Sequence, residues 1–160
     1  MFKPQGILPA LVTPFTEDGK HLNEEALRNL VNSCIKLGVS GVVPCGTTGE
    51  FVNLTVEEKK KVIDVVVDQV NGKVKVVAGT GASGTDQALE MTKYAKDAGA
   101  DAALIVNPSY YKGMMSSSVL TNYYFAITDS SPIPIMLYNM PLATGIDMSL
   151  SLIHISEPTR

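Results

Sequence analysis

The amino-acid sequence predicts an α/β fold in which the strands of a parallel sheet alternate with helices. Short, continuously apolar segments recur along the chain, and a segment with the apolar periodicity of a helix follows most of them. Strands that are apolar throughout are typical of a sheet covered on both faces. A spacing of about 30 residues between successive strands suits right-handed β-α-β crossovers. We expect five such β-α units.

The first predicted unit consists of a strand over residues 7–12 and a helix over residues 23–37. Asn23 is the expected N-cap of this helix, since its side chain can accept a hydrogen bond from a free backbone amide, and Gly38 is expected to end the helix. A second strand, over residues 41–45, follows almost directly.

A capping box marks the start of the second predicted helix, because the Thr55 hydroxyl and the Glu58 carboxylate can each bind a free backbone amide. This helix is expected to run to Val70 and to end at Asn71-Gly72. The remaining predicted elements are a strand over 74–78, a helix over 85–98, a strand over 102–106, a loop over 107–113, a helix over 117–128 and a strand over 134–138.

Composition excludes several classes of protein. With 45% hydrophobic and 18% charged residues, the 160-residue chain can bury a sizeable core. A net charge of −3 and the lack of a basic cluster argue against nucleic acid as a partner. No apolar run reaches the roughly 20 residues that span a bilayer, and the first residues lack the apolar segment of a secretory signal. We therefore expect a cytoplasmic protein that binds no membrane.

The cysteines and histidines indicate neither a metal site nor a catalytic triad. Cys34 and Cys45 lack metal-ligand spacing and are expected to be reduced and mostly buried. His21 and His154 are too few and too far apart to form a metal site. Any chemistry must come from other groups.

Two α/β architectures remain open at this point. Gly79-Thr80-Gly81-Ala82-Ser83-Gly84 matches the G-x-G-x-x-G pattern of dinucleotide-binding folds, but it follows the third predicted strand and not the first. Asn107 stands where that fold would have an acid after the next strand, while Asp101 lies at the start of that strand. The alternative is a glycine-rich loop of a β/α barrel.

Hydroxyl-bearing side chains follow one predicted strand after another. In a β/α barrel the working groups lie on the loops at the carboxyl ends of the strands. Gly46 and Gly49 enclose two threonines, and glycines let the backbone turn sharply and approach a small molecule. An ordinary tight turn, or a tyrosine that only plugs a strand end, would look the same residue by residue. The hydroxyl-bearing residues are Thr13, Thr47, Thr48, Thr80, Tyr110, Tyr111 and Tyr138.

Three motifs together resemble one family. Pro14-Phe15, Gly46-Thr47-Thr48-Gly49-Glu50 and Tyr138-Asn139-Met140-Pro141, in this order and spacing, resemble the dihydrodipicolinate synthase / N-acetylneuraminate lyase family of class I aldolases. The resemblance covers residues 1 to about 150. It implies a (β/α)8 TIM barrel, usually in a homotetramer. A lysine of the barrel forms a Schiff base with pyruvate or another 2-oxo acid, which reacts with an aldehyde, and no metal or organic cofactor is used.

The resemblance also implies roles for individual residues. Tyr138 would be the general acid/base and Thr47 part of its proton relay, while Thr48 would bind the carboxylate of the 2-oxo acid. Tyr111 corresponds to the tyrosine that completes the relay from a neighbouring subunit. One extra residue in this loop leaves Tyr110 as the alternative. A tyrosine, whose usual pKa is about 10, needs such neighbours to exchange protons near pH 7.

Two features depart from the family pattern. Synthases that make dihydrodipicolinate carry an arginine two residues after the proline of the loop that follows Tyr138, and Ala143 stands there. This loop favours aldolases of 2-oxo-3-deoxy sugar acids or of 4-hydroxy-2-oxoglutarate. The family's Schiff-base lysine lies about 30 residues beyond Tyr138, which is past Arg160. No lysine of this chain matches it, and Lys112 lies beside the tyrosine pair instead.

Residues 151–160 resemble a translated adapter sequence, and we expect a non-native tail after a barrel portion over residues 1–150. The alternative is a genuine short helix. The first functional hypothesis is the N-terminal part of a 2-oxo-acid aldolase, inactive without its lysine. The second is a non-catalytic 2-oxo-acid-binding or assembly module that pairs its open sheet edges with a partner.

Overall fold

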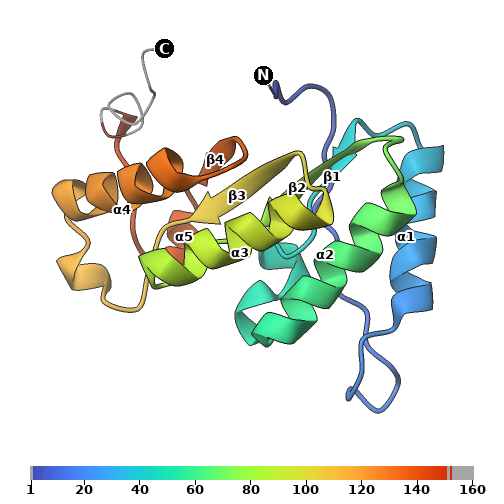
Figure 1. Cartoon of the computed structure of the whole chain (residues 1–160). Coiled ribbons are helices and arrows are strands. Elements are labelled where there is room, and N and C mark those ends of the chain that lie inside the picture. The colour runs from blue at the N-terminus through green and yellow to red at the C-terminus, as the bar shows by residue number, and fades with distance from the viewer. Residues whose placement is uncertain (1, 151, 153–160) are drawn as a thin grey trace.

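The structure is a computed structural model that describes residues 2–150 and residue 152 (Figure 1). Of the expected tail, only Leu152 falls within the described residues. Five helices and four strands occur in the described part of the chain, together with three short 3₁₀ segments. The helices are α1 (Glu24–Lys36), α2 (Val56–Val70), α3 (Thr85–Ala98), α4 (Ser117–Ser130) and the short α5 (Pro141–Thr144). The strands are β1 (Gly41–Val42), β2 (Lys75–Gly79), β3 (Ala102–Val106) and β4 (Ile135–Tyr138).

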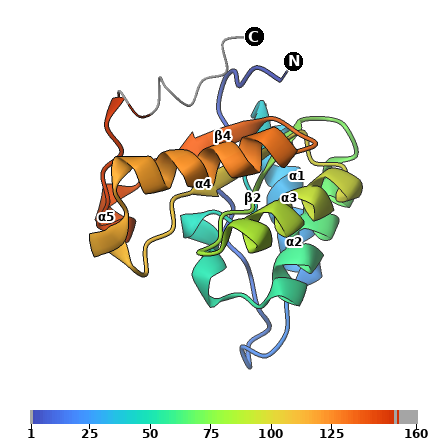
Figure 2. The same ribbon diagram turned by 60° about the vertical axis from the view of Figure 1, so that its left-hand side comes forward.

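The four strands form one parallel sheet in the order β1-β2-β3-β4, so each strand pairs with the next one along the chain. The long helices pack in the same order, α1 against α2, α2 against α3 and α3 against α4 (Figures 1 and 2). A doubly wound dinucleotide fold reverses its strand order at a switch point, where the ligand binds. The observed order has no such reversal, and it excludes the dinucleotide alternative.

The helix ends agree with the sequence signals. The Asn23 side chain accepts a hydrogen bond from the Ala26 amide at 3.0 Å, and the predicted capping box of Thr55 and Glu58 is present at the start of α2. Asn71 ends α2 in the left-handed conformation. Polar caps at the expected positions confirm the predictions for α1 and α2.

The predicted strand over residues 7–12 is wrong. This segment runs beside β1 but forms only an isolated parallel bridge, Ala10 to Val43. The Val43 amide donates to the Pro9 carbonyl at 2.9 Å, and the Leu11 amide donates to the Val43 carbonyl at 3.0 Å. Pro9 has no amide hydrogen for the next bond of the ladder, so the ladder is interrupted there, and the next backbone hydrogen bond runs from the Ser40 amide to the Ile7 carbonyl at 2.9 Å.

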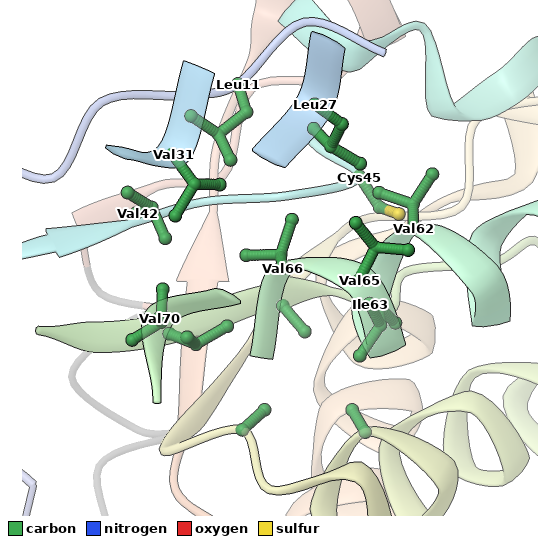
Figure 3. Close-up of a cluster of buried hydrophobic side chains, with 14 of the residues drawn as sticks. Leu11, Leu27, Val31, Val42, Cys45, Val62, Ile63, Val65, Val66 and Val70 are labelled. Atoms are coloured by element: carbon green, nitrogen blue, oxygen red, sulfur yellow. The ribbon is translucent and has the colours of Figure 1, made fainter. Parts of the chain in front are cut away.

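Alternate residues of the strands pack on the two faces of the sheet. Val42, Val76 and Ala78 belong to the main apolar cluster, which includes Leu27 and Val31 of α1 and four valines and an isoleucine of α2 (Figure 3). A smaller cluster on the other face contains Val77, Ala102 and, partly buried, Leu104 and Met136. The helices thus cover one face of the sheet, and the opposite face carries the smaller apolar cluster.

Candidate active site at the carboxyl ends of the strands

The loop after β1 is compact and carries the two threonines. Cys45 (φ +55°) and Glu50 (φ +52°) both have left-handed backbone conformations, which are uncommon for residues with a side chain. Between them lies the 3₁₀ segment Thr47–Gly49. Gly46 and Gly49 are buried, while Thr47 and Thr48 are exposed. The loop therefore presents its hydroxyls outward on a fixed backbone.

The N-terminal segment braces this loop. The Thr13 hydroxyl donates a hydrogen bond to the Gly49 carbonyl at 2.8 Å. A Cβ on Gly49 would lie 2.9 Å from the Leu11 carbonyl oxygen, so the two segments approach more closely than a side chain allows. Gly49 thus serves the contact between the loop and the N-terminal segment, and the Thr13 hydroxyl is occupied by that contact.

Thr47 and Tyr138 meet across the sheet. The Thr47 hydroxyl donates to the Tyr138 hydroxyl at 3.4 Å, although the two residues lie 91 positions apart. Thr47 lies on the loop after β1, and Tyr138 is the last residue of β4, so the contact joins the two outer strands of the sheet. Neighbouring strands are spaced about 4.8 Å apart, so three such steps in a flat sheet would separate the strand ends by roughly 14 Å. Curvature of the sheet therefore brings the two outer strands toward each other.

A small pocket lies between these strand ends. Thr47 and Tyr138 line it together with residues of the two middle strands and their loops. The remaining lining residues are Cys45, Gly46, Phe51, Gly79, Gly81, Leu104 and Val106. Its wall is apolar apart from the two hydroxyls and the backbone, and its volume of about 10 Å³ leaves room for no more than a water molecule in this form of the chain.

Of the other predicted site residues, Gly46 lines this pocket, whereas Thr48, Gly49, Tyr110 and Tyr111 lie outside it. Thr48 is exposed, and its hydroxyl has no hydrogen-bond partner within the described chain. The Tyr110 and Tyr111 side chains are 81% and 66% exposed and contact each other edge to face, with ring centroids 5.0 Å apart. The structure thus brings Thr47 and Tyr138 together and leaves Thr48 and the tyrosine pair facing solvent.

Thr80 does not face the site, contrary to its expected place in the series of hydroxyls. Its side chain is buried and shares a 2.8 Å hydrogen bond with the Thr92 hydroxyl of α3. Thr92 in turn donates to the Ala88 carbonyl at 2.7 Å. Buried hydroxyls need such partners, and here the partners fix α3 on β2.

The glycines of the G-x-G-x-x-G match serve close packing of the backbone. A Cβ on Gly79 would collide with the Cys45 carbonyl oxygen, and one on Gly81 would lie 2.8 Å from the Val106 amide nitrogen. Both glycines line the pocket, where they let the ends of neighbouring strands approach. Sequence reasoning identified the glycines but not this role.

Asn107 is a further buried polar residue that sequence reasoning did not interpret correctly. It directly follows β3 and is 2% exposed, yet neither its amide nitrogen nor its amide oxygen has a partner among the described residues. From the sequence, its position after an apolar strand indicates only that an acid is lacking there. Burial of its amide could not be read from sequence spacing.

Within the described residues, no group of three or more His, Cys, Asp and Glu side chains is arranged to hold a metal ion. No helix in the same part of the chain is long and apolar enough to cross a membrane.

Cys45 is expected to resist alkylation. Burial raises the pKa of its thiol to about 12, with the positive charge of Lys59 opposing the shift. Because only the thiolate reacts readily, Cys45 should stay unlabelled by iodoacetamide at pH 8 while the half-buried Cys34 is modified. Peptide mass spectrometry should find label on Cys45 only after unfolding in urea. Equal labelling of both thiols in the folded protein would contradict the described burial.

Parallel strands in sequential order, curved so that the outer ones approach, and covered by helices on one face, define the β/α-barrel class of proteins. The chain belongs to the dihydrodipicolinate synthetase family, whose model matches residues 3–155. The resemblance drawn from the three sequence motifs is thereby confirmed.

Relatives and solved structures agree with this assignment. The chain is 48% identical over 144 residues to the 4-hydroxy-tetrahydrodipicolinate synthase of Methanopyrus kandleri, a match that covers 90% of this chain and 47% of that protein. The dihydrodipicolinate synthase of Acinetobacter baumannii, solved with pyruvate, is 40% identical with a TM-score of 0.88. That match covers 92% of this chain and 50% of the solved chain. YagE of E. coli K12, also solved with pyruvate, is 35% identical with a TM-score of 0.91, at 97% and 51% coverage. The chain spans about half the length of the curated relatives it matches.

Proposed function

We propose that residues 1–150 are the N-terminal portion of a (β/α)8 aldolase that performs reversible aldol chemistry on pyruvate or another 2-oxo acid. The observation that carries this proposal is the 3.4 Å contact between the Thr47 and Tyr138 hydroxyls over a small pocket at the strand ends. The pyruvate bound in two similar structures supports a 2-oxo acid as ligand. The complete protein would be a cytoplasmic homotetramer.

In this reaction a lysine amine condenses with the 2-oxo acid to a Schiff base and releases water. Loss of a proton from the carbon next to the Schiff base gives an enamine, whose carbon attacks the aldehyde carbon to form one carbon–carbon bond while the aldehyde oxygen takes a proton. Water then hydrolyses the new Schiff base, which releases the product and the lysine amine. Tyr138 would transfer protons at these steps, with Thr47 passing them on through their shared hydrogen bond. The exposed hydroxyl of Thr48 and the backbone of Gly46 would hold the 2-oxo acid carboxylate, and Gly49, whose amide donates to the Gly46 carbonyl at 3.0 Å, would keep this turn in shape.

Tyr111, or Tyr110 beside it, would complete the relay in the pocket of a neighbouring subunit. Exposure of both rings supports this role, because a tyrosine that works in another subunit must project from its own. The T-shaped contact between the rings would hold the projecting pair in one orientation. Assembly would thus be required for a complete site.

Ala143 supports a particular group of substrates. It is exposed on α5, the short helix that follows Tyr138, and it offers no charge to a second substrate. We therefore favour cleavage or synthesis of a 2-oxo-3-deoxy sugar acid or of 4-hydroxy-2-oxoglutarate over dihydrodipicolinate synthesis. The Schiff-base lysine would lie on a sixth strand beyond Arg160, which leaves the 160-residue chain inactive.

Borohydride reduction in the presence of pyruvate tests the function. We expect no stoichiometric adduct on the 160-residue chain, and one pyruvyl group per chain on the complete gene product, because only the latter would supply the lysine. Intact-mass measurement distinguishes these outcomes. An adduct on the short chain would contradict its inactivity, whereas an unmodified complete protein would contradict the aldolase function and favour a non-catalytic binding module.

A further inference from the structure

Two loops that leave neighbouring strands converge beside the proposed site. β3 and β4 pair in parallel with Val106 opposite Tyr138, so the segments that follow these residues emerge side by side. The first contains the 3₁₀ segment Lys112–Met114, and the second contains α5. Both segments therefore begin at the carboxyl-end edge of the sheet, where Tyr138 also lies.

The Lys112 side chain lies against the end of α5. A Cβ on Gly145, the residue that ends this helix, would lie 3.3 Å from Lys112 Cδ and 3.6 Å from its Nζ. Gly145 also has a left-handed φ of +68°, which glycine adopts without strain. The glycine thus leaves room for the lysine stem, and the ammonium group lies close to the end of α5.

The ammonium group of Lys112 has no charged partner in the described part of the chain. Lys59 and Lys60, on α2, lie over the rings of Phe51 and Tyr94, whereas Lys112 has neither an ion pair nor a ring beneath it. Asp147, two residues after Gly145, instead accepts a hydrogen bond from Asn139 at 2.8 Å. An unpaired cation on a loop that leaves the same edge of the sheet as Tyr138 attracts anionic groups to that edge.

We propose that Lys112 is a specificity-determining residue, whose ammonium group binds a carboxylate on the aldehyde partner. This inference rests on the proposed aldolase function and refines it: the aldehyde is anionic, as in the 4-hydroxy-2-oxoglutarate class, and not an uncharged sugar aldehyde. Lys112 supplies from the β3 loop the positive charge that Ala143 does not supply from α5. A lysine offers a point charge, so it accepts carboxylates at varied distances from the reacting carbon.

Steady-state kinetics of the complete gene product test this inference. With pyruvate saturating, we expect Lys112→Met to raise KM about tenfold for aldehydes that bear a carboxylate, which corresponds to the loss of one charge-assisted contact. Glyoxylate and succinic semialdehyde serve as the short and long anionic probes, and glyceraldehyde is the uncharged probe. The KM for glyceraldehyde and the kcat values should change less than twofold, and Lys112→Arg should restore KM for the anionic probes.

Lys73→Met is the matched control, because Lys73 is an exposed lysine before β2, at the opposite end of the strands, and all three aldehydes should keep their KM. An equal loss with charged and uncharged aldehydes would show that Lys112 only supports the end of α5, and an unchanged KM would show that it binds no substrate. Either result overturns the inference. Borohydride trapping of pyruvate on each variant separates these outcomes from failure of the aldolase function, since the adduct requires no aldehyde.

Discussion

Replacing Tyr138 by phenylalanine is expected to lower kcat of the complete gene product by about 10²–10⁴-fold, the usual contribution of a positioned acid/base group. The substitution removes only the hydroxyl that meets Thr47 at 3.4 Å, and the ring continues to line the pocket. The change should fall on kcat, and the KM for pyruvate should move little, because the hydroxyl transfers protons and does not hold the carboxylate.

Tyr94→Phe is the control for this substitution. The Tyr94 hydroxyl donates to an Asp64 carboxylate oxygen at 2.7 Å on the outer surface of α2 and α3, remote from the strand ends. Loss of this exposed hydrogen bond should leave kcat unchanged. If Tyr138→Phe retains more than a tenth of the wild-type kcat, Tyr138 is not the proton-transfer group.

Local signals predicted the helices well because each helix end depends on a few neighbouring residues. The Thr55 and Glu58 capping box and the Asn23 cap appear where the sequence placed them. The failed strand over residues 7–12 shows the limit of apolar patterning. Its composition suits a strand, but pairing depends on hydrogen bonds to another segment, and Pro9 interrupts these.

The site was predictable to the extent that strand order was predictable. Placing Thr47 and Tyr138 after strands of one parallel sheet put them on the same side, and the 3.4 Å contact agrees with that placement. The orientation of Thr80 was not predictable, since a residue just past a strand end can turn toward either face of the sheet. Burial against Thr92 on α3 decided the matter. Such choices depend on packing between elements, which residue spacing does not encode.

Gly79→Ala is expected to destabilise the complete gene product by about 1–3 kcal/mol or more, because the added methyl group would overlap the Cys45 carbonyl oxygen. The Gly79 amide also donates to the Pro44 carbonyl at 2.9 Å, so the two strands cannot separate to relieve the overlap without losing this hydrogen bond. The displaced Cys45 leads directly into Gly46 and Thr47, and kcat should fall as well. Urea unfolding and aldol turnover measure the two effects.

Gly113→Ala is the matched control, because nothing lies within 4 Å of a Cβ at Gly113 and its φ is not left-handed. Its unfolding free energy should stay within about 0.5 kcal/mol of the wild type, as is usual for surface substitutions. If Gly79→Ala unfolds at the same urea concentration as Gly113→Ala, the result would contradict the close contact between Gly79 at the end of β2 and the Cys45 carbonyl after β1. A loss confined to Gly79→Ala would show that the glycine match in this chain holds two strand ends together, which is the packing that positions Thr47 opposite Tyr138.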